Sequence, residues 1–217
     1  MKNRIFKITV STLLAMTCMA TANENDCFEE DPCFYEYDNR ISFFVPLHLT
    51  YERIKFDAFY VGIEGWVEPV FASGSNKSFS MQWIAEAEFR LGYNYLFKGR
   101  NHATPFVGAG VIDEFRLGKK GRQVPYGVFG LLYMHEFSPT FNLGANFKGM
   151  IGRSIHKHHR RSFGSPVGGI DVSLPITFFY GSRKQWDFRS EPFDIYLHGR
   201  HRSRNYFGLR GTVGYRF

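Results

Sequence analysis

The sequence has no long apolar run after its first 22 residues. A helix that crosses a membrane needs about 20 consecutive apolar residues, and no later segment of this 217-residue chain provides them. A bundle of membrane-spanning helices is therefore excluded. The chain is nevertheless rich in aromatic residues, with 24 Phe and 12 Tyr, and it contains 22 Gly. Interleaved with polar residues, this composition suits strands that alternate between two environments.

The N-terminus has the organisation of a secretory signal peptide. Its first seven residues carry three basic side chains and no acid, and the apolar stretch Ile8–Ala20 follows. Residues 20–22 then supply small residues at the positions that signal peptidase prefers. We predict that residues 1–22 are a signal peptide cleaved after Ala22. The apolar stretch is too short for a membrane anchor, and the residues before Cys18 match a lipoprotein signal poorly.

Cysteine is scarce: only Cys27 and Cys33 remain after cleavage. Both fall in residues 23–38, which we predict to be an N-terminal periplasmic segment. In an oxidising compartment they could form a local disulfide, although so short a loop constrains little beyond itself. We favour a disulfide between them that stabilises the N-terminal tail. Intermolecular pairing or free thiols are the alternatives.

Strict alternation of apolar and polar residues is the main structural signal. In residues 83–97 every second side chain from Trp83 to Phe97 is apolar or aromatic, whereas the intervening positions include Glu86 and Glu88. Strands of soluble proteins are usually about five or six residues long. A longer alternating run with aromatic residues at both ends is typical of a tilted membrane strand.

The same alternation recurs along the chain. It covers residues 59–67, 141–151, 170–180 and 205–217, and more loosely 106–117, 126–137 and 186–197. In the last of these the pattern changes parity around Pro192, which a β-bulge would explain.

Residues 39–53 also alternate and, read as one strand, bring the number of candidate strands to nine. Bacterial single-chain barrels have an even number of strands and both termini in the periplasm. We therefore predict an all-β fold over residues 39–217, an antiparallel up-and-down transmembrane β-barrel. Eight wall strands are favoured, with 39–53 as an appendage. Ten strands are the alternative. The odd count of nine could also arise because another segment is misread or because residues 28–38 contain a further strand.

The final strand places Val213, Tyr215 and Phe217 at alternate positions before the C-terminus. This ending resembles the C-terminal signature of bacterial outer-membrane proteins. The resemblance implies location in the outer membrane and recognition of these three residues by the barrel-assembly machinery. The layout, with the passages GYNYLF at 92–97 and PFVGAGV at 105–111, is similar to that of small OmpA/OmpX-type membrane barrels.

Charged residues occupy the face of the predicted strands that would line the lumen. A small barrel is only wide enough for its own side chains, and a buried charge without a partner is very costly. We expect an ion-pair network that fills the lumen, with a narrow polar channel as the alternative. The expected network comprises Glu64, Glu86, Glu88, Arg90, Glu114, Arg116, Lys148, Asp171 and Arg210.

The connections on the outer side lack acidic residues. With Phe217 in the periplasm, these connections are residues 72–78, 118–123, 153–166 and 198–204, and none contains Asp or Glu. Their candidate ligand-binding residues are Lys119, Lys120, Arg122, Arg153, Lys157, Arg160, Arg161, Arg200, Arg202 and Arg204. Clustered arginines suit phosphate and sulfate groups. Lipopolysaccharide phosphates are the nearest such ligands and sulfated host glycans the next; location argues against nucleic acid. Simple solvation of the loops is the alternative.

Three histidines, His156, His158 and His159, lie in one of these connections and suggest a metal site. The adjacent Lys157, Arg160 and Arg161 would repel a cation, and no carboxylate assists. We therefore expect no metal ion and no other cofactor.

An enzyme is the remaining alternative, because some small membrane barrels modify lipid A. His201 and Ser203 have the spacing of a base and a nucleophile on one face of an extended segment. No acid follows Ser203 in the chain to orient the imidazole. We therefore predict a non-enzymatic barrel that supports envelope integrity or adhesion through its basic loops. A porin-like channel and a lipid A-modifying enzyme that uses His201 and Ser203 are the alternatives.

Overall fold

The computed structural model describes residues 37–44, 47–74, 79–97, 100–116, 119–156, 164–181, 183–199 and 203–217. The described residues form twelve strands. These are β1 (Asn39–Phe44), β2 (Leu47–Arg53), β3 (Ala58–Gly74), β4 (Phe79–Phe97), β5 (Asn101–Arg116), β6 (Lys119–Ser138), β7 (Phe141–Arg153), β8 (Ile155–His156), β9 (Pro166–Ser173), β10 (Ile176–Tyr180), β11 (Trp186–Gly199) and β12 (Ser203–Arg216). In this part of the chain no helix is long and apolar enough to cross a membrane.

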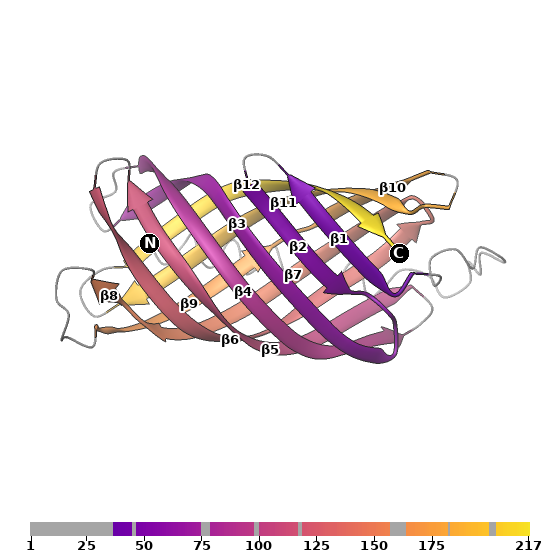
Figure 1. Cartoon of the computed structure of the whole chain (residues 1–217), viewed down its shortest axis with the longest axis horizontal. Helices are drawn as coiled ribbons and strands as arrows, with labels where there is room; N and C mark the ends of the chain where they lie inside the picture. The colour runs from indigo at the N-terminus through magenta and orange to yellow at the C-terminus, as the bar shows by residue number, and fades with distance from the viewer. Residues whose placement is uncertain are drawn as a thin grey trace. The chain divides into compact units, whose positions relative to one another are not determined.

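The strands close into an antiparallel barrel (Figure 1). From β1 to β7 each strand pairs with the next, β9 and β10 both pair with β7 and β11, and β12 pairs with β11 and β1 to complete a ring of eleven strands. The short strand β8 lies outside this ring and pairs only with β6. The prediction of an all-β antiparallel barrel is confirmed. The predicted strand number is wrong, both as eight and as ten.

The count differs because the wall does not have the same number of strands along its length. β9 and β10 lie end to end, and both pair with β7 and β11. The hairpin β1–β2 is inserted between β12 and β3 in only one half of the wall, and in the other half β12 pairs directly with β3. A section near one end therefore crosses eight strands, and a section near the other crosses ten. We call these the eight-stranded end and the ten-stranded end.

Residues 39–53 are part of the wall, so their interpretation as a single appended strand is wrong. They form two short strands whose register pairs Ile41 with Tyr51 and Phe43 with Leu49. Odd-numbered residues therefore face outward on both strands. Because apolar residues stay at odd-numbered positions before and after the turn, the sequence pattern does not reveal the turn between the two strands. In Figure 1 the indigo hairpin lies beside the yellow strand β12 at the ten-stranded end.

The expected bulge at Pro192 is absent. β11 pairs with β12 in one uninterrupted register from Trp186 to His198. Its inward side chains are polar at first, at Asp187 and Arg189, and apolar later, at Phe193 and Ile195. Odd-numbered residues face inward along the whole of β11. What changes is the lumen they face, which is polar near Asp187 and apolar near Ile195.

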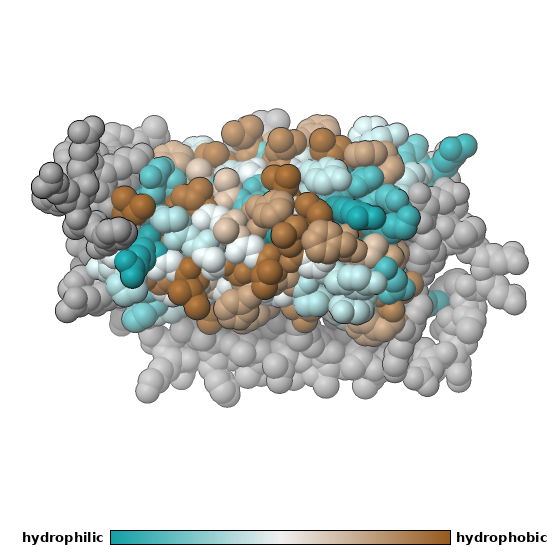
Figure 2. Space-filling view, turned by 60° about the horizontal axis from the view of Figure 1, so that its bottom comes forward, coloured by the Kyte–Doolittle hydropathy of each residue, from teal (hydrophilic) through white to brown (hydrophobic). Residues whose placement is uncertain are grey.

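The outward face of the wall is apolar over its middle, whereas hydrophilic residues gather towards the ends (Figure 2). Aromatic rings contact one another around the ten-stranded end, on β4, β6, β7, β10, β11 and β12. These rings belong to Tyr93, Tyr95, Phe97, Tyr133, Phe137, Phe141, Phe178, Tyr180, Trp186, Tyr215 and Phe217. We call this set the aromatic girdle.

Candidate functional site

A buried ion-pair network occupies the middle of the lumen. Lys148 on β7 lies 3.3 Å from Glu86, 3.4 Å from Glu88 and 2.9 Å from Asp171. Arg90 on β4 pairs with Glu88 and with Glu64 of β3. The hydroxyl of Tyr126 lies within hydrogen-bonding distance of both Glu86 and Glu88 and can donate its single proton to either. Each of these carboxylates therefore has a cationic or hydroxyl partner, which offsets the cost of burying it.

Apolar side chains form a layer across the lumen towards the eight-stranded end, where the buried Gln82 and Glu114 also lie. Each of the eight strands at this end contributes at least one buried member of a single cluster, which we call the apolar plug. The contributions are Val70, Ile84, Ile112, Val124, Met150, Val167, Ile195 and Tyr206. Protein interiors pack with few voids larger than a water molecule, so the plug closes the lumen at this level.

Arg210 marks the boundary between the apolar plug and the polar part of the lumen. Its guanidinium carbon lies 4.2 Å from the ring centroid of Trp66 and 4.0 Å from that of Phe193. The two rings, whose centroids are 5.8 Å apart, hold this guanidinium by cation–π attraction. The Phe193 ring needs Gly208 opposite it, because a Cβ there would lie 2.5 Å from the ring.

A polar cavity of about 120 Å³ occupies the lumen towards the ten-stranded end. The hairpin β1–β2 supplies one wall of it, including Arg40, His48 and Glu52. Arg40 donates two hydrogen bonds to Asp187, of 2.8 and 2.7 Å, and one of 2.9 Å to Glu52. These contacts join the hairpin to β11 from inside the barrel.

The structure brings most of the predicted lumen residues together. Eight of the nine lie in the lumen with the ion pairs expected of their charges; the side chain of Arg116 lies outside the described residues. Glu114 is separate from the central network and pairs with Arg204 and, at 3.8 Å, with Arg122 near the eight-stranded end.

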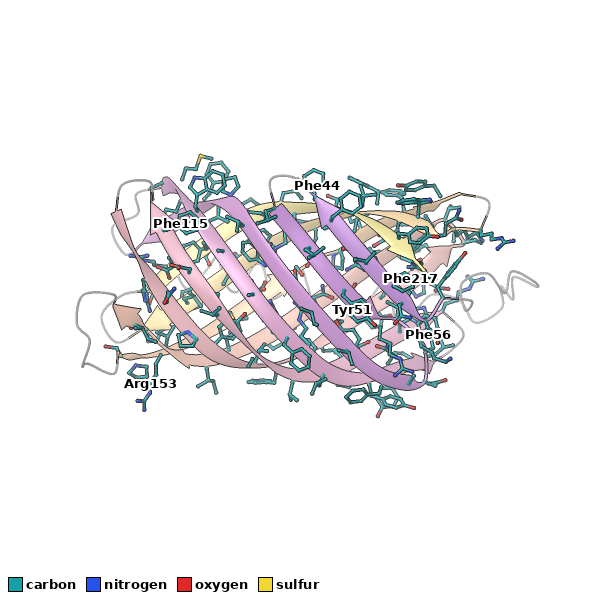
Figure 3. All side chains as sticks on the ribbon, viewed as in Figure 1. Phe44, Tyr51, Phe56, Phe115, Arg153 and Phe217 are labelled. Atoms are coloured by element: carbon teal, nitrogen blue, oxygen red, sulfur yellow. The ribbon has the colours of Figure 1, made fainter. Side chains whose placement is uncertain are left out.

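The predicted basic rim is described only in part. Arg122 and Arg204 turn towards the lumen and Glu114, whereas Arg153 is exposed and points away from the wall at the eight-stranded end (Figure 3). The other seven side chains lie outside the described residues, namely Lys119, Lys120, Lys157, Arg160, Arg161, Arg200 and Arg202.

The remaining predicted residues fall at both ends of the barrel. Val213, Tyr215 and Phe217 face outward, and the backbone of Phe217 pairs with that of Asn39. Ser203 bonds with His198, whose Nδ1 lies 2.8 Å from its Oγ. His201 lies outside the described residues, as do Cys27, Cys33, His158, His159 and the side chain of His156.

Part of the cavity and its supporting contacts was not predicted from the sequence. Arg40 and Glu52 fall in residues 39–53, which the sequence pattern places outside the wall. Asp187 and Arg189 fall in the segment whose apolar pattern changes parity. The inward-facing charges at alternate positions were the signal that could have identified all four.

Comparison with known proteins gives a distant likeness in fold. No protein-family model matches the sequence, and no curated protein matches it. Among solved structures, the fold is similar to OmpTdeltaL8, a loop L8 deletion mutant of OmpT, an outer membrane protein of Vibrio cholerae. The identity is 13%, the TM-score is 0.35, and the match covers 82% of this chain and 54% of that one. This chain thus spans about half the length of that structure. At this TM-score the likeness says nothing about function.

Proposed function

We propose that the chain is an integral outer-membrane barrel, exported by a cleaved signal peptide, with a closed lumen and a basic outer rim that binds anionic surface groups. The outer wall supports the membrane location. Its middle is apolar, and the aromatic girdle lies along six strands of the ten-stranded end, at the level where interfacial rings lie in membrane barrels. A C-terminal strand with outward Tyr215 and Phe217 at that end is consistent with a periplasmic C-terminus.

The filled lumen is the observation that carries the functional proposal. The apolar plug and the ion pairs of Lys148 lie across the lumen of the described barrel, which argues against the porin alternative. In planar lipid bilayers, we expect the purified protein to give no steady single-channel current. Regular conductance steps would show that the lumen opens, and would overturn the proposal.

Because a closed lumen does not transport solutes, we look for a binding surface at the ends of the barrel. The eight-stranded end is the outer end in the proposed orientation, and its four connections contain no acid. Arg153 projects outward there, where lipid phosphates of the outer leaflet would lie. We therefore propose that this rim contacts lipopolysaccharide phosphates, or the sulfate groups of host glycans, without catalysing a reaction.

A charge-matched comparison tests the rim. The rim variant replaces Arg153, Lys157, Arg160 and Arg161 with Ser, and the control replaces four basic residues of the other end, Arg53, Lys55, Arg100 and Lys184, with Ser. Binding to lipopolysaccharide and to heparin is measured in zwitterionic micelles at several salt concentrations. The rim variant should bind at least about tenfold more weakly and with a shallower salt dependence, because each lost cation removes a screened attraction. The control should bind like the wild type.

Equal binding by the wild type and the rim variant would overturn the rim proposal. A loss of the same size in the control variant would also contradict it, because binding would then depend on net charge alone. Heat-dependent mobility on gels verifies that both variants remain folded.

One observation favours lipid A modification as a second candidate function. Ser203 has an imidazole neighbour, His198, and both lie on the outward face near the eight-stranded end. Mass spectrometry of lipid A from cells that express the wild type or the Ser203→Ala variant tests it. Loss of an acyl-chain difference in the variant would establish an enzyme, whereas identical lipid A in cells with and without the gene would exclude one.

A further inference from the structure

The polar cavity at the ten-stranded end contains guanidinium groups whose hydrogen-bonding capacity is not used by the described residues. Arg210 is 3% exposed and lines the cavity, yet its Nε and Nη2 have no hydrogen-bond partner there. Its nearest carboxylates, on Glu86 and Glu191, are 3.8 and 3.9 Å away. A buried charged donor without an acceptor is costly.

The two carboxylates near Arg210 are already engaged by other donors. Glu191 accepts hydrogen bonds from Ser173 and, at 3.3 Å, from Asn146. Glu86 accepts from Tyr126 and, at 3.3 Å, from Lys148. These hydrogen bonds use one oxygen of each acid. The other oxygen of Glu86 lies 3.8 Å from Nη2 of Arg210, too far for a hydrogen bond, and also has no partner among the described residues.

Arg189, on β11, also has a guanidinium donor without a hydrogen-bond partner. It lines the cavity, and its buried Nε has no hydrogen-bond partner among the described residues. Its Nη1 lies 3.6 Å from Glu52, and that carboxylate already accepts a hydrogen bond of 2.9 Å from Arg40.

The register places these two arginines together. Arg189 lies opposite Thr212, and Arg210 lies opposite Glu191, so the arginines are diagonal neighbours on the inward face. Such neighbours have their backbones about 7–8 Å apart, within reach of long side chains. The hydroxyl of Ser42, fully buried and also without a partner in the described part of the chain, lines the same cavity.

The composition and size of the cavity favour a small anion. Six lining residues are Lys or Arg, and four are Glu. At ~10–15 Å³ for each water position, 120 Å³ gives room for about ten water molecules or a ligand of similar size. Access is from the ten-stranded end: the side chains of Arg189 and Glu136 are 16% and 13% exposed, whereas that of Lys148 is 6% exposed.

We infer that the cavity is a binding site for a small phosphate- or carboxylate-bearing anion, held between Arg189 and Arg210 and assisted by Ser42. Guanidinium groups bind both chemical classes through paired N–H donors. This site faces the side of the membrane opposite to the proposed rim and does not depend on the rim's function.

Calorimetric titration of the folded barrel in zwitterionic micelles tests the inference. The probes are inorganic phosphate and succinate, each added at constant ionic strength. The wild type should bind at least one of them saturably at one site, and the one that binds identifies the chemical class. Arg189→Gln should weaken binding at least about tenfold, as expected for a lost charge-assisted hydrogen bond. Arg210→Gln should weaken it at least as much.

Arg53→Gln is the matched control, because Arg53 is a basic residue of the same end that faces outward, and it should leave binding unchanged. If Arg210→Gln fails to fold because Arg210 packs against Trp66 and Phe193, the partly exposed Arg189 still gives a clear test. Absence of saturable binding of both anions to the wild type, or unchanged binding by Arg189→Gln, would overturn the inference.

Discussion

At the residue scale, the contact between Arg40 and Asp187 sets the geometry of the ten-stranded end. Gly214 is part of this contact, because a Cβ there would lie 2.6 Å from Asp187 Oδ1 and 2.7 Å from Arg40 Nε. Sequence analysis could predict that charges in the lumen must pair. It could not predict this pair, because the partners are 147 positions apart and only the register of β1, β12 and β11 brings them together.

Asp187→Asn should lower the free energy of unfolding by about 3–5 kcal/mol, because it removes one partner of a buried ion pair and leaves Arg40 undercompensated. Urea titration of the barrel folded in lipid vesicles measures this change. Asp38→Asn is the control: its pair with Lys55 is 3.0 Å long, but the two side chains are 46% and 51% exposed. That change should cost at most about 1 kcal/mol. Equal effects of the two substitutions would contradict the assigned role of Arg40 and Asp187.

At the scale of strands, the alternation predicted correctly which residues face outward, but it could not predict where the chain turns. Outward positions stay odd-numbered through the hairpin β1–β2, so period two alone cannot separate one strand from two. Pro46, between the two strands, was the available signal, because proline interrupts a β ladder. The misreading at Pro192 has a different cause: a lumen that is polar at one end and apolar at the other resembles a strand that changes face.

Cysteine cross-linking tests the placement of the hairpin in the wall. In a background with Cys27 and Cys33 changed to Ser, Ile41→Cys combined with Tyr215→Cys should form a disulfide on oxidation, because the structure pairs these positions. Ile41→Cys combined with Leu209→Cys should not, because directly bridged Cα atoms are at most about 7 Å apart. Non-reducing peptide mapping by mass spectrometry detects the bond. If residues 39–53 lay outside the wall, neither combination would cross-link.

At the scale of the whole molecule, the proposal of a membrane barrel requires a gradient of environments along the outer wall. Val107, in the middle of β5, and Met81, near the eight-stranded end of β4, are exposed to the same degree, 62% and 63%. In water these two sites would be equivalent. In a bilayer they would differ, because Val107 would face the hydrocarbon and Met81 the headgroup region.

Val107→Arg should therefore lower the free energy of unfolding from lipid vesicles by about 2–4 kcal/mol, and Met81→Arg by about 0–1 kcal/mol. Val107→Leu, which keeps the site apolar, should have little effect. The measurement is urea titration in vesicles, with the change of gel mobility on heating as the indicator of the folded barrel. Equal costs of the two arginine substitutions would show that the wall does not cross a bilayer. A cost confined to Val107 would place the middle of the wall in hydrocarbon and would make the eight-stranded end, with Arg153, a surface at the level of lipid phosphates.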